Sequence, residues 1–165
     1  MASETSVHRR RASCLLTLAD TFPDKLSPNG IGLSPDQKTL YEAETITSRL
    51  WAFEVTGPGT LSPKGMPGRG GKMLFAPHCW SLFDSLAVEA CGNIAIAIAI
   101  ATLDRGGITV VSPRGKALDF VPMPDEHTTN ICFGGADLRV AWITLSFSGQ
   151  LVKLDWPREG LALNF

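Results

Sequence analysis

The stretch that decides the fold is Ser27-Pro28-Asn29-Gly30-Ile31-Gly32-Leu33-Ser34-Pro35-Asp36, in which a short polar side chain precedes an alternating apolar run. Pro28 fixes its own φ at about −65°, and Gly30 tolerates the tight backbone geometry that aims Asn29. A similar phrase begins at Asp84. Each phrase predicts a strand whose first residue points at something other than a hydrophobic core.

The phrase opens a longer pattern of strand, turn, strand, turn and strand that occurs three times. The copies start at Asn29, Asp84 and Asn130, with spacings of 55 and 46 residues. A fourth, less regular strand is expected to close each copy. The expected strands are 30–33, 39–45, 49–55 and one within 71–75; 85–88, 94–102, 107–111 and one within 118–121; and 130–133, 139–145, 150–154 and one within 161–165.

Repeats of this length with four short antiparallel strands indicate the blades of a β-propeller. We therefore predict an all-β fold, a partial β-propeller of about three four-stranded blades. Three blades do not close a ring, because propellers protect their sheet edges with typically four to eight blades. Either a missing N-terminal segment supplies the rest, or two halves associate through their open blade edges, or the chain is unstable alone.

Composition narrows the class of protein. The apolar share is 44% and the net charge is −1 over 165 residues, so we predict neither a nucleic-acid partner nor a membrane partner. The longest apolar run, 94–101, is too short to cross a bilayer as a helix. The four cysteines form no C-x-x-C pair. Free thiols in a reducing compartment are therefore expected, and we predict a cytoplasmic location.

The N-terminal residues differ from the rest of the chain. Residues 1–14 include Arg9-Arg10-Arg11 and are polar and basic, and they show no periodicity. We predict a disordered basic extension there. Residues 15–165 are predicted to form the propeller domain, beginning with a strand near 15–18.

An ordered set of phrases resembles one known family. The set consists of Pro28 to Asp36, Leu40-Tyr41 with Glu44-Thr45, Arg49-Leu50-Trp51, Asp84 to Val88, Gly92-Asn93 and Thr129 to Gly135. It resembles the senescence-marker-protein/gluconolactonase family of six-bladed propellers, the regucalcin-like lactonases. The resemblance covers about Leu16 to the C-terminus. It implies the C-terminal half of a six-bladed parent that hydrolyses sugar lactones with a divalent metal.

The same resemblance implies roles for two residues. In that family the Asn of the Pro-Asn-Gly phrase is a metal ligand, and here it is Asn29. The Asp that opens the later phrase is a second ligand and the proposed general base, and here it is Asp84. The family's first ligand, a Glu in the first blade, has no counterpart in this sequence. From the residues alone, without the resemblance, Asn29 is interpreted as a turn residue, and Asp84 could cap a strand.

The chemistry of these side chains fits that implication. An amide oxygen and a carboxylate suit a hard divalent cation, with Ca²⁺ expected first and Zn²⁺, Mg²⁺ or Mn²⁺ as alternatives. The metal would polarise a lactone carbonyl, and Asp84 would take the proton of the attacking water. Two ligands alone would hold Ca²⁺ weakly. Two hypotheses stay open: a gluconolactonase-like hydrolase acting on a small sugar lactone, or a catalytically inactive truncated fragment that serves as a binding or scaffold piece.

Overall fold

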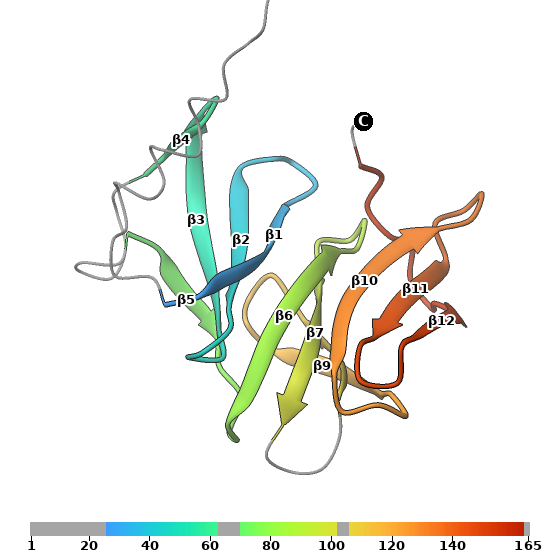
Figure 1. The fold of residues 1–165 in the computed structure, drawn as a ribbon. Coiled ribbons are helices and arrows are strands. Elements are labelled where there is room, and N and C mark those ends of the chain that lie inside the picture. The colour runs from blue at the N-terminus through green and yellow to red at the C-terminus, as the bar shows by residue number, and fades with distance from the viewer. Residues whose placement is uncertain (1–25, 63–69, 102–105, 164–165) are drawn as a thin grey trace, which may run out of the picture.

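The computed structural model describes residues 26–62, 70–101 and 106–163, which form three antiparallel β-sheets (Figure 1). The first sheet holds β1 (Pro28–Leu33), β2 (Thr39–Glu44), β3 (Arg49–Gly57), β4 (Thr60–Leu61) and β5 (Lys72–Phe75). The second holds β6 (Ser81–Val88), β7 (Ile94–Ala101), β8 (Gly107–Val111) and β9 (Ala117–Pro122). The third holds β10 (Thr128–Gly134), β11 (Val140–Leu145) and β12 (Gln150–Asp155). Across these ranges no helix is long and apolar enough to span a membrane.

The all-β prediction is confirmed, and most predicted strands lie where the pattern placed them. Strand β6 starts at Ser81, four residues before the predicted start, and the short β4 was not predicted. The predicted disordered extension and the strand near 15–18 lie outside the described residues. Within the described ranges, each of the first two sheets has an outer strand beyond its third strand, β5 and β9 respectively.

The fourth strand predicted within 161–165 is wrong for its described residues, because 161–163 form no strand. The segment before them makes other backbone bonds. The Ala90 N–H donates to the Glu159 carbonyl, the Gly160 N–H donates to the Leu138 carbonyl, and the Leu161 N–H donates to the Val88 carbonyl. The chain therefore crosses from the third sheet to the end of β6 instead of pairing along β12.

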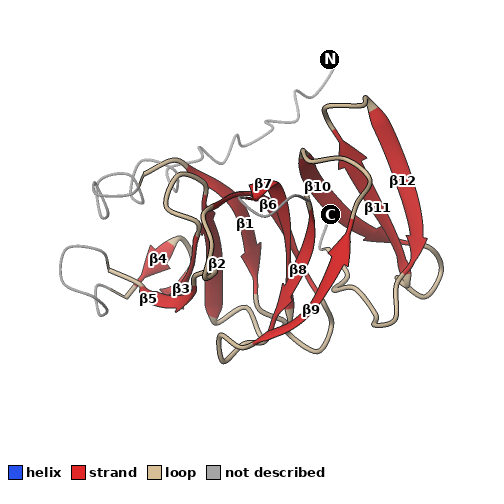
Figure 2. Ribbon diagram, turned by 90° about the horizontal axis from the view of Figure 1, so that it is seen from below, coloured by secondary structure: helices blue, strands red, loops and turns tan. Residues whose placement is uncertain are grey.

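The first strand of each sheet lies against its counterpart in the next sheet. Strand β1 lies beside β6, and β6 lies beside β10, so the three sheets fan out from these inner strands (Figures 1 and 2). One hydrophobic core fills the space between the first and second sheets, and another fills the space between the second and third. The inner strands are therefore held side by side by two separate cores.

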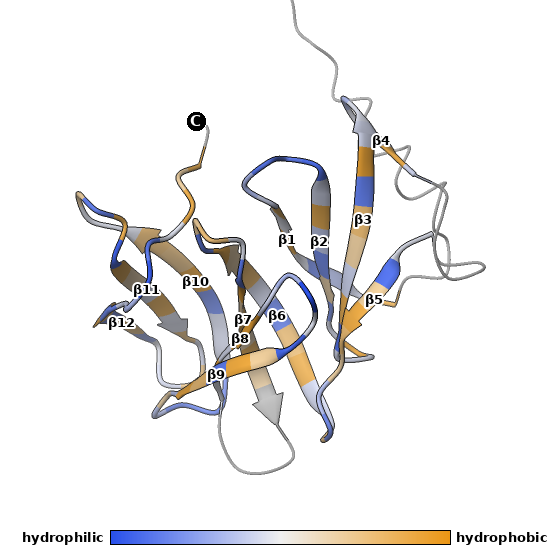
Figure 3. Cartoon of the chain, turned by 180° about the vertical axis from the view of Figure 1, so that it is seen from behind, coloured by the Kyte–Doolittle hydropathy of each residue, from blue (hydrophilic) through white to orange (hydrophobic). Residues whose placement is uncertain are grey.

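Strand β7 contributes side chains to both cores, because isoleucine and alanine alternate along it. Its isoleucines Ile94, Ile96 and Ile98 pack in the core shared with the first sheet. Its alanines Ala95 and Ala97 pack in the core shared with the third sheet. Successive side chains of a strand point to opposite faces, so the sequence pattern alone assigns the two rows. The two rows therefore pack against different neighbouring sheets, and Figure 3 shows the hydropathy of the residues in these strands.

A buried carboxylate joins the C-terminal segment to the second sheet. Glu89 follows β6 and is fully buried. It accepts hydrogen bonds from Trp156 Nε1 at 2.8 Å and from Arg158 Nε at 2.7 Å, and Asn93 Nδ2 adds a third at 2.9 Å. Burial by itself would raise the pKa of Glu89, but the hydrogen bonds from Arg158, Trp156 and Asn93 outweigh it and lower the pKa. Glu89 therefore stays ionised inside the fold.

Replacing Glu89 tests this joint. Glu89→Ala leaves the Arg158 guanidinium and the Trp156 N–H without their acceptor, so we expect the free energy of unfolding at pH 7 to fall by about 3 kcal/mol. Because the folded pKa is lowered, the stabilisation is present above the unfolded pKa of about 4.3 and disappears as pH falls through the folded pKa. Urea denaturation at pH 7 and at lower pH measures both effects.

The matched control for that experiment is Glu159→Ala, which removes an exposed carboxylate nearby. Its unfolding curve should stay within about 0.5 kcal/mol of the unmodified chain. Equal stability of the Glu89→Ala and Glu159→Ala variants would show that the buried joint contributes nothing.

Candidate metal site at the inner strands

Each inner strand carries one extra residue near its leading polar side chain. On β1, Pro28 pairs with Glu44 while Ile31 pairs with Glu42, so three steps on β1 match two on β2. On β6, Phe83 pairs with Ile98 while Leu86 pairs with Ile96. On β10, Thr128 pairs with Leu145 while Asn130 pairs with Thr144. Each shift is a β-bulge, which bends a strand and re-aims a side chain.

Two of these bulges bring the predicted ligands together. Asn29 lies in the bulge of β1, and Asp84 lies in the bulge of β6. The Asn29 side chain and the Ser85 backbone N–H lie near enough to the Asp84 carboxyl group to lower its pKa. An ionised carboxylate can only accept hydrogen bonds, so the amide N–H of Asn29 is the group that can donate to it. The structure therefore places side by side two residues that are 55 positions apart in the sequence.

The backbones of β1 and β6 approach very closely at this point. A Cβ atom on Gly30 would lie 2.6 Å from the Asp84 carbonyl oxygen and 2.7 Å from the Leu86 nitrogen. Those neighbours are backbone atoms, which cannot turn aside as a side chain can. Gly30 is therefore required for the close approach. Gly32 continues it, since its Cβ would meet the Leu86 side chain at 2.8 Å.

Residues 11–147 match the sequence pattern of the SMP-30/gluconolactonase/LRE-like region. The match covers more than half of the chain. The chain belongs to this family.

The individual relatives agree with that assignment. A 6-deoxy-6-sulfogluconolactonase from Pseudomonas putida is 29% identical over 140 residues, which are 83% of this chain and 45% of the relative. Regucalcin from Xenopus laevis is 24% identical over 132 residues, which are 79% of this chain and 40% of that protein. The structure of a calcium-binding regucalcin from Agrobacterium tumefaciens superposes on this chain with a TM-score of 0.66 at 20% sequence identity. The superposition covers 83% of this chain and 48% of the regucalcin chain. This family member thus spans less than half the length of these relatives.

Asp84 is half-buried, whereas most carboxylates lie exposed at the protein surface. Burial raises the pKa of the Asp84 carboxyl group above its ordinary value. The hydrogen bonds from the Asn29 side chain and the Ser85 N–H offset only part of that rise. A raised pKa makes the carboxylate a stronger base than an ordinary aspartate.

The third inner strand does not add a ligand of the same kind. Asn130 is exposed, and its Oδ1 accepts the Ile131 N–H at 2.8 Å. The Asn130 side chain therefore bonds to the backbone of its own strand. The neighbouring Thr129 hydroxyl lies 3.0 Å from the Thr144 hydroxyl and 2.6 Å from the Ser146 hydroxyl. Sequence reasoning did not single out these hydroxyls, since nothing in a Thr-Thr-Asn phrase indicates a cross-strand pair.

The donor set suits a hard divalent cation. Asp84 supplies a half-buried carboxylate, and Asn29 supplies the oxygen of an exposed side-chain amide. A cation beside Asp84 would relieve the unfavourable desolvation of its charge. Among the described residues no three His, Cys, Asp or Glu side chains cluster as metal ligands. Asn29 and Asp84 therefore fit as part of a cation site, with other oxygen ligands needed to complete six to eight for Ca²⁺.

Enlarging Gly30 tests the close approach of β1 and β6. In Gly30→Ala the new methyl group meets backbone at both contacts, so β1 must move away from β6. We expect the free energy of unfolding to fall by about 1–3 kcal/mol and the Asn29 side-chain amide resonances to shift. Urea denaturation and ¹H–¹⁵N spectra measure the two effects.

Gly57→Ala is the matched control, because a Cβ there meets nothing within 4 Å. That variant should unfold at the same urea concentration as the unmodified chain. If Gly30→Ala behaved like Gly57→Ala, the two strands would not be in contact at this position.

Neutralising Asp84 tests the cause of its raised pKa. Since the folded pKa is raised, the contribution of this group to stability is fully present below the unfolded pKa of about 3.9 and is lost as pH rises through the folded pKa. In the absence of divalent metal at pH 7, we expect Asp84→Asn to melt roughly 2–4 °C higher than the unmodified chain. The difference should shrink at pH 4.

Thermal melts at the two pH values measure this effect, and Glu126→Gln serves as the control, since it neutralises an exposed carboxylate. At each pH the quantity compared is the melting temperature of Asp84→Asn minus that of the unmodified chain. A smaller difference at pH 7 than at pH 4 would contradict the raised pKa of Asp84.

Proposed function

We propose that the three sheets are consecutive blades of a β-propeller and that Asn29 and Asp84 hold a divalent cation for the hydrolysis of a sugar lactone. The observation that carries this proposal is the proximity of Asn29 to Asp84, which lie in bulges on adjacent inner strands. Membership of the family supports the reaction class, since similar proteins are named 6-deoxy-6-sulfogluconolactonase and gluconolactonase. The calcium-binding regucalcin with a similar fold supports Ca²⁺ as the first candidate metal.

The bound cation, Asp84 and Asn29 would each have a different role in the hydrolysis. A bound cation would act as a Lewis acid toward the lactone carbonyl oxygen. Asp84 would act as general base and accept a proton from the water whose oxygen attacks the acyl carbon. The ring C–O bond then breaks, and the leaving ring oxygen gains a proton to give the open hydroxy acid. Asn29 would hold the Asp84 carboxylate in position through its amide N–H.

The pair is one part of a larger site. This chain spans about half the length of its relatives or less, and Asn29 is exposed. We propose that the remaining ligands and the groups that select the lactone come from outside the two inner strands that carry the pair. The half-exposed position of the pair also favours a second candidate, a catalytically inactive piece that binds metal or serves as a scaffold.

A reducing cellular compartment fits this proposal. The described cysteines Cys79, Cys91 and Cys132 are exposed free thiols. Exposed thiols persist where disulfides do not form. We therefore infer a cytoplasmic location for the chain.

Asp84→Ala tests the proposed chemistry. We expect lactone hydrolysis, followed as acid release from a glucono-lactone with Ca²⁺ or Mn²⁺ present, to fall by at least about 10²-fold because the general base is lost. We expect the rise in melting temperature on adding metal to disappear in Asp84→Ala and to weaken in Asn29→Ala.

Asn130→Ala is the matched control, because it removes the corresponding asparagine of the third inner strand. It should keep both the hydrolysis and the metal effect. A well-folded Asp84→Ala chain that retained metal-dependent hydrolysis would overturn the catalytic assignment. A metal effect that depends on Asp84 without any hydrolysis would favour the non-catalytic candidate, and a metal effect that survives in both Asp84→Ala and Asn29→Ala would rule out the site.

A further inference from the structure

The third sheet ends one strand earlier than the other two. Strand β8 is followed by β9 on its outer side, and β3 pairs with β5 on its outer side. Strand β12 holds the same place in the third sheet, and within the described residues it pairs only with β11. Figure 2 shows β12 at the outer edge of the sheets. An edge strand of this kind presents unpaired backbone groups that can template another strand.

The register identifies which backbone groups face the free edge. The Trp156 N–H donates to the Arg139 carbonyl at 2.7 Å, and Leu154 pairs with Ala141 in the same register. Hydrogen-bonded and non-hydrogen-bonded positions alternate along an antiparallel strand. The N–H and C=O groups of Leu151, Lys153 and Asp155 therefore point away from β11.

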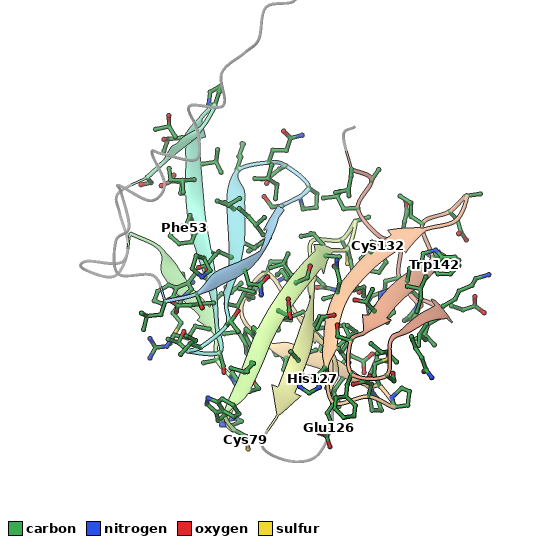
Figure 4. The ribbon with its side chains drawn as sticks, in the orientation of Figure 1. Phe53, Cys79, Glu126, His127, Cys132 and Trp142 are labelled. Carbon is green, nitrogen blue, oxygen red and sulfur yellow. The ribbon has the colours of Figure 1, made fainter. Side chains whose placement is uncertain are left out.

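The side chains on this edge are exposed and carry opposite charges. Leu151 is 64% exposed, and Lys153 and Asp155 are also exposed. They belong to the face of the third sheet that turns away from the second sheet, as does Trp142, which is labelled in Figure 4. Lys153 Nζ lies 5.9 Å from the centre of the Trp142 ring. The edge thus combines free backbone groups with one positive and one negative side chain at alternate positions.

We propose that a second copy of this chain pairs with β12 in antiparallel fashion, with the two-fold axis passing between the two Leu154 residues. In this register each Lys153 lies opposite Asp155 of the other copy, so two pairs of opposite charge form together with backbone hydrogen bonds. A two-fold axis at Lys153 would instead place Lys153 opposite Lys153, which is unfavourable. An axis at Val152 would place Lys153 opposite Leu151. Charge complementarity therefore selects the register centred on Leu154.

The interface is isologous, since the same strand serves both copies. It does not depend on the proposed function, because the Asn29–Asp84 pair lies on β1 and β6 and β12 is the outermost strand of a different sheet. Asp84→Ala should leave the dimer intact. Failure of the lactonase assay and failure of dimerisation are therefore distinguishable results.

A charge-reversal cycle tests the pairing. Sedimentation velocity of the 165-residue chain should show a species of twice the 17.7 kDa monomer mass at high protein concentration. Lys153→Asp and Asp155→Lys each place like charges opposite one another twice, so each should raise the dimer dissociation constant by at least about tenfold. The double variant Lys153→Asp/Asp155→Lys should restore the dimer. Lys116→Asp, which reverses an exposed charge elsewhere, should have no effect.

The double variant also controls for the contact between Lys153 and Trp142, since that contact is lost in it and the dimer should still return. A chain that stays monomeric at all concentrations overturns the proposal. A dimer that persists in both single reversals also overturns the proposal. The two copies would then associate through another surface, and the edge of β12 would be left to a strand from a different partner.

Disulfide trapping tests the register independently of charge. In a chain whose four native cysteines are replaced by serine, Leu154→Cys brings two thiols directly opposite at a non-hydrogen-bonded pair, where Cα atoms are about 4.5 Å apart. We expect a covalent dimer on mild oxidation. Val152→Cys is the matched control and should stay monomeric. Trapping of the Val152→Cys chain but not the Leu154→Cys chain would overturn the register.

Discussion

The close approach of the β1 and β6 backbones at Gly30 is the constraint on which the candidate site depends. No side chain larger than hydrogen fits there, because the Asp84 carbonyl oxygen and the Leu86 nitrogen occupy the space. Bringing two strands this close places their leading polar side chains near one another. The bulges then turn Asn29 and Asp84 toward one another. A polar pair that would be unfavourable in a core is thus built at the junction of two sheets.

The rest of the structure holds this junction in place. The isoleucine row of β7 packs toward the first sheet and the alanine row packs toward the third, so one strand anchors both interfaces. Glu89 ties the segment after β12 back to the end of β6 through Trp156 and Arg158. Asn29 and Asp84 take no part in the hydrogen bonds of Glu89, and their side chains therefore remain available to bind a ligand.

The sequence predicted much of this arrangement, for identifiable physical reasons. Alternation and turn residues located most strands, and the repeated polar residue before an apolar run pointed to Asn29 and Asp84. The bulges could not be predicted, because an extra residue in one strand is visible only against its partner's register. The predicted last strand failed because Gly160 and Leu161 bond to Leu138 and Val88, contacts between segments distant in sequence. The buried role of Glu89 was missed for the same reason, since its partners lie 67 and 69 residues away.

The central claim is that Asn29 and Asp84 together bind a divalent cation. Paramagnetic broadening by Mn²⁺ in ¹H–¹⁵N spectra tests it most directly, because the effect falls steeply with distance from the ion. The account predicts that the Asn29 side-chain amide and the Ser85 backbone amide broaden first, and that Asp84→Asn abolishes this selectivity. Broadening that began at exposed acidic turns such as Asp36 or Asp137, with Asn29 and Ser85 unaffected, would contradict it.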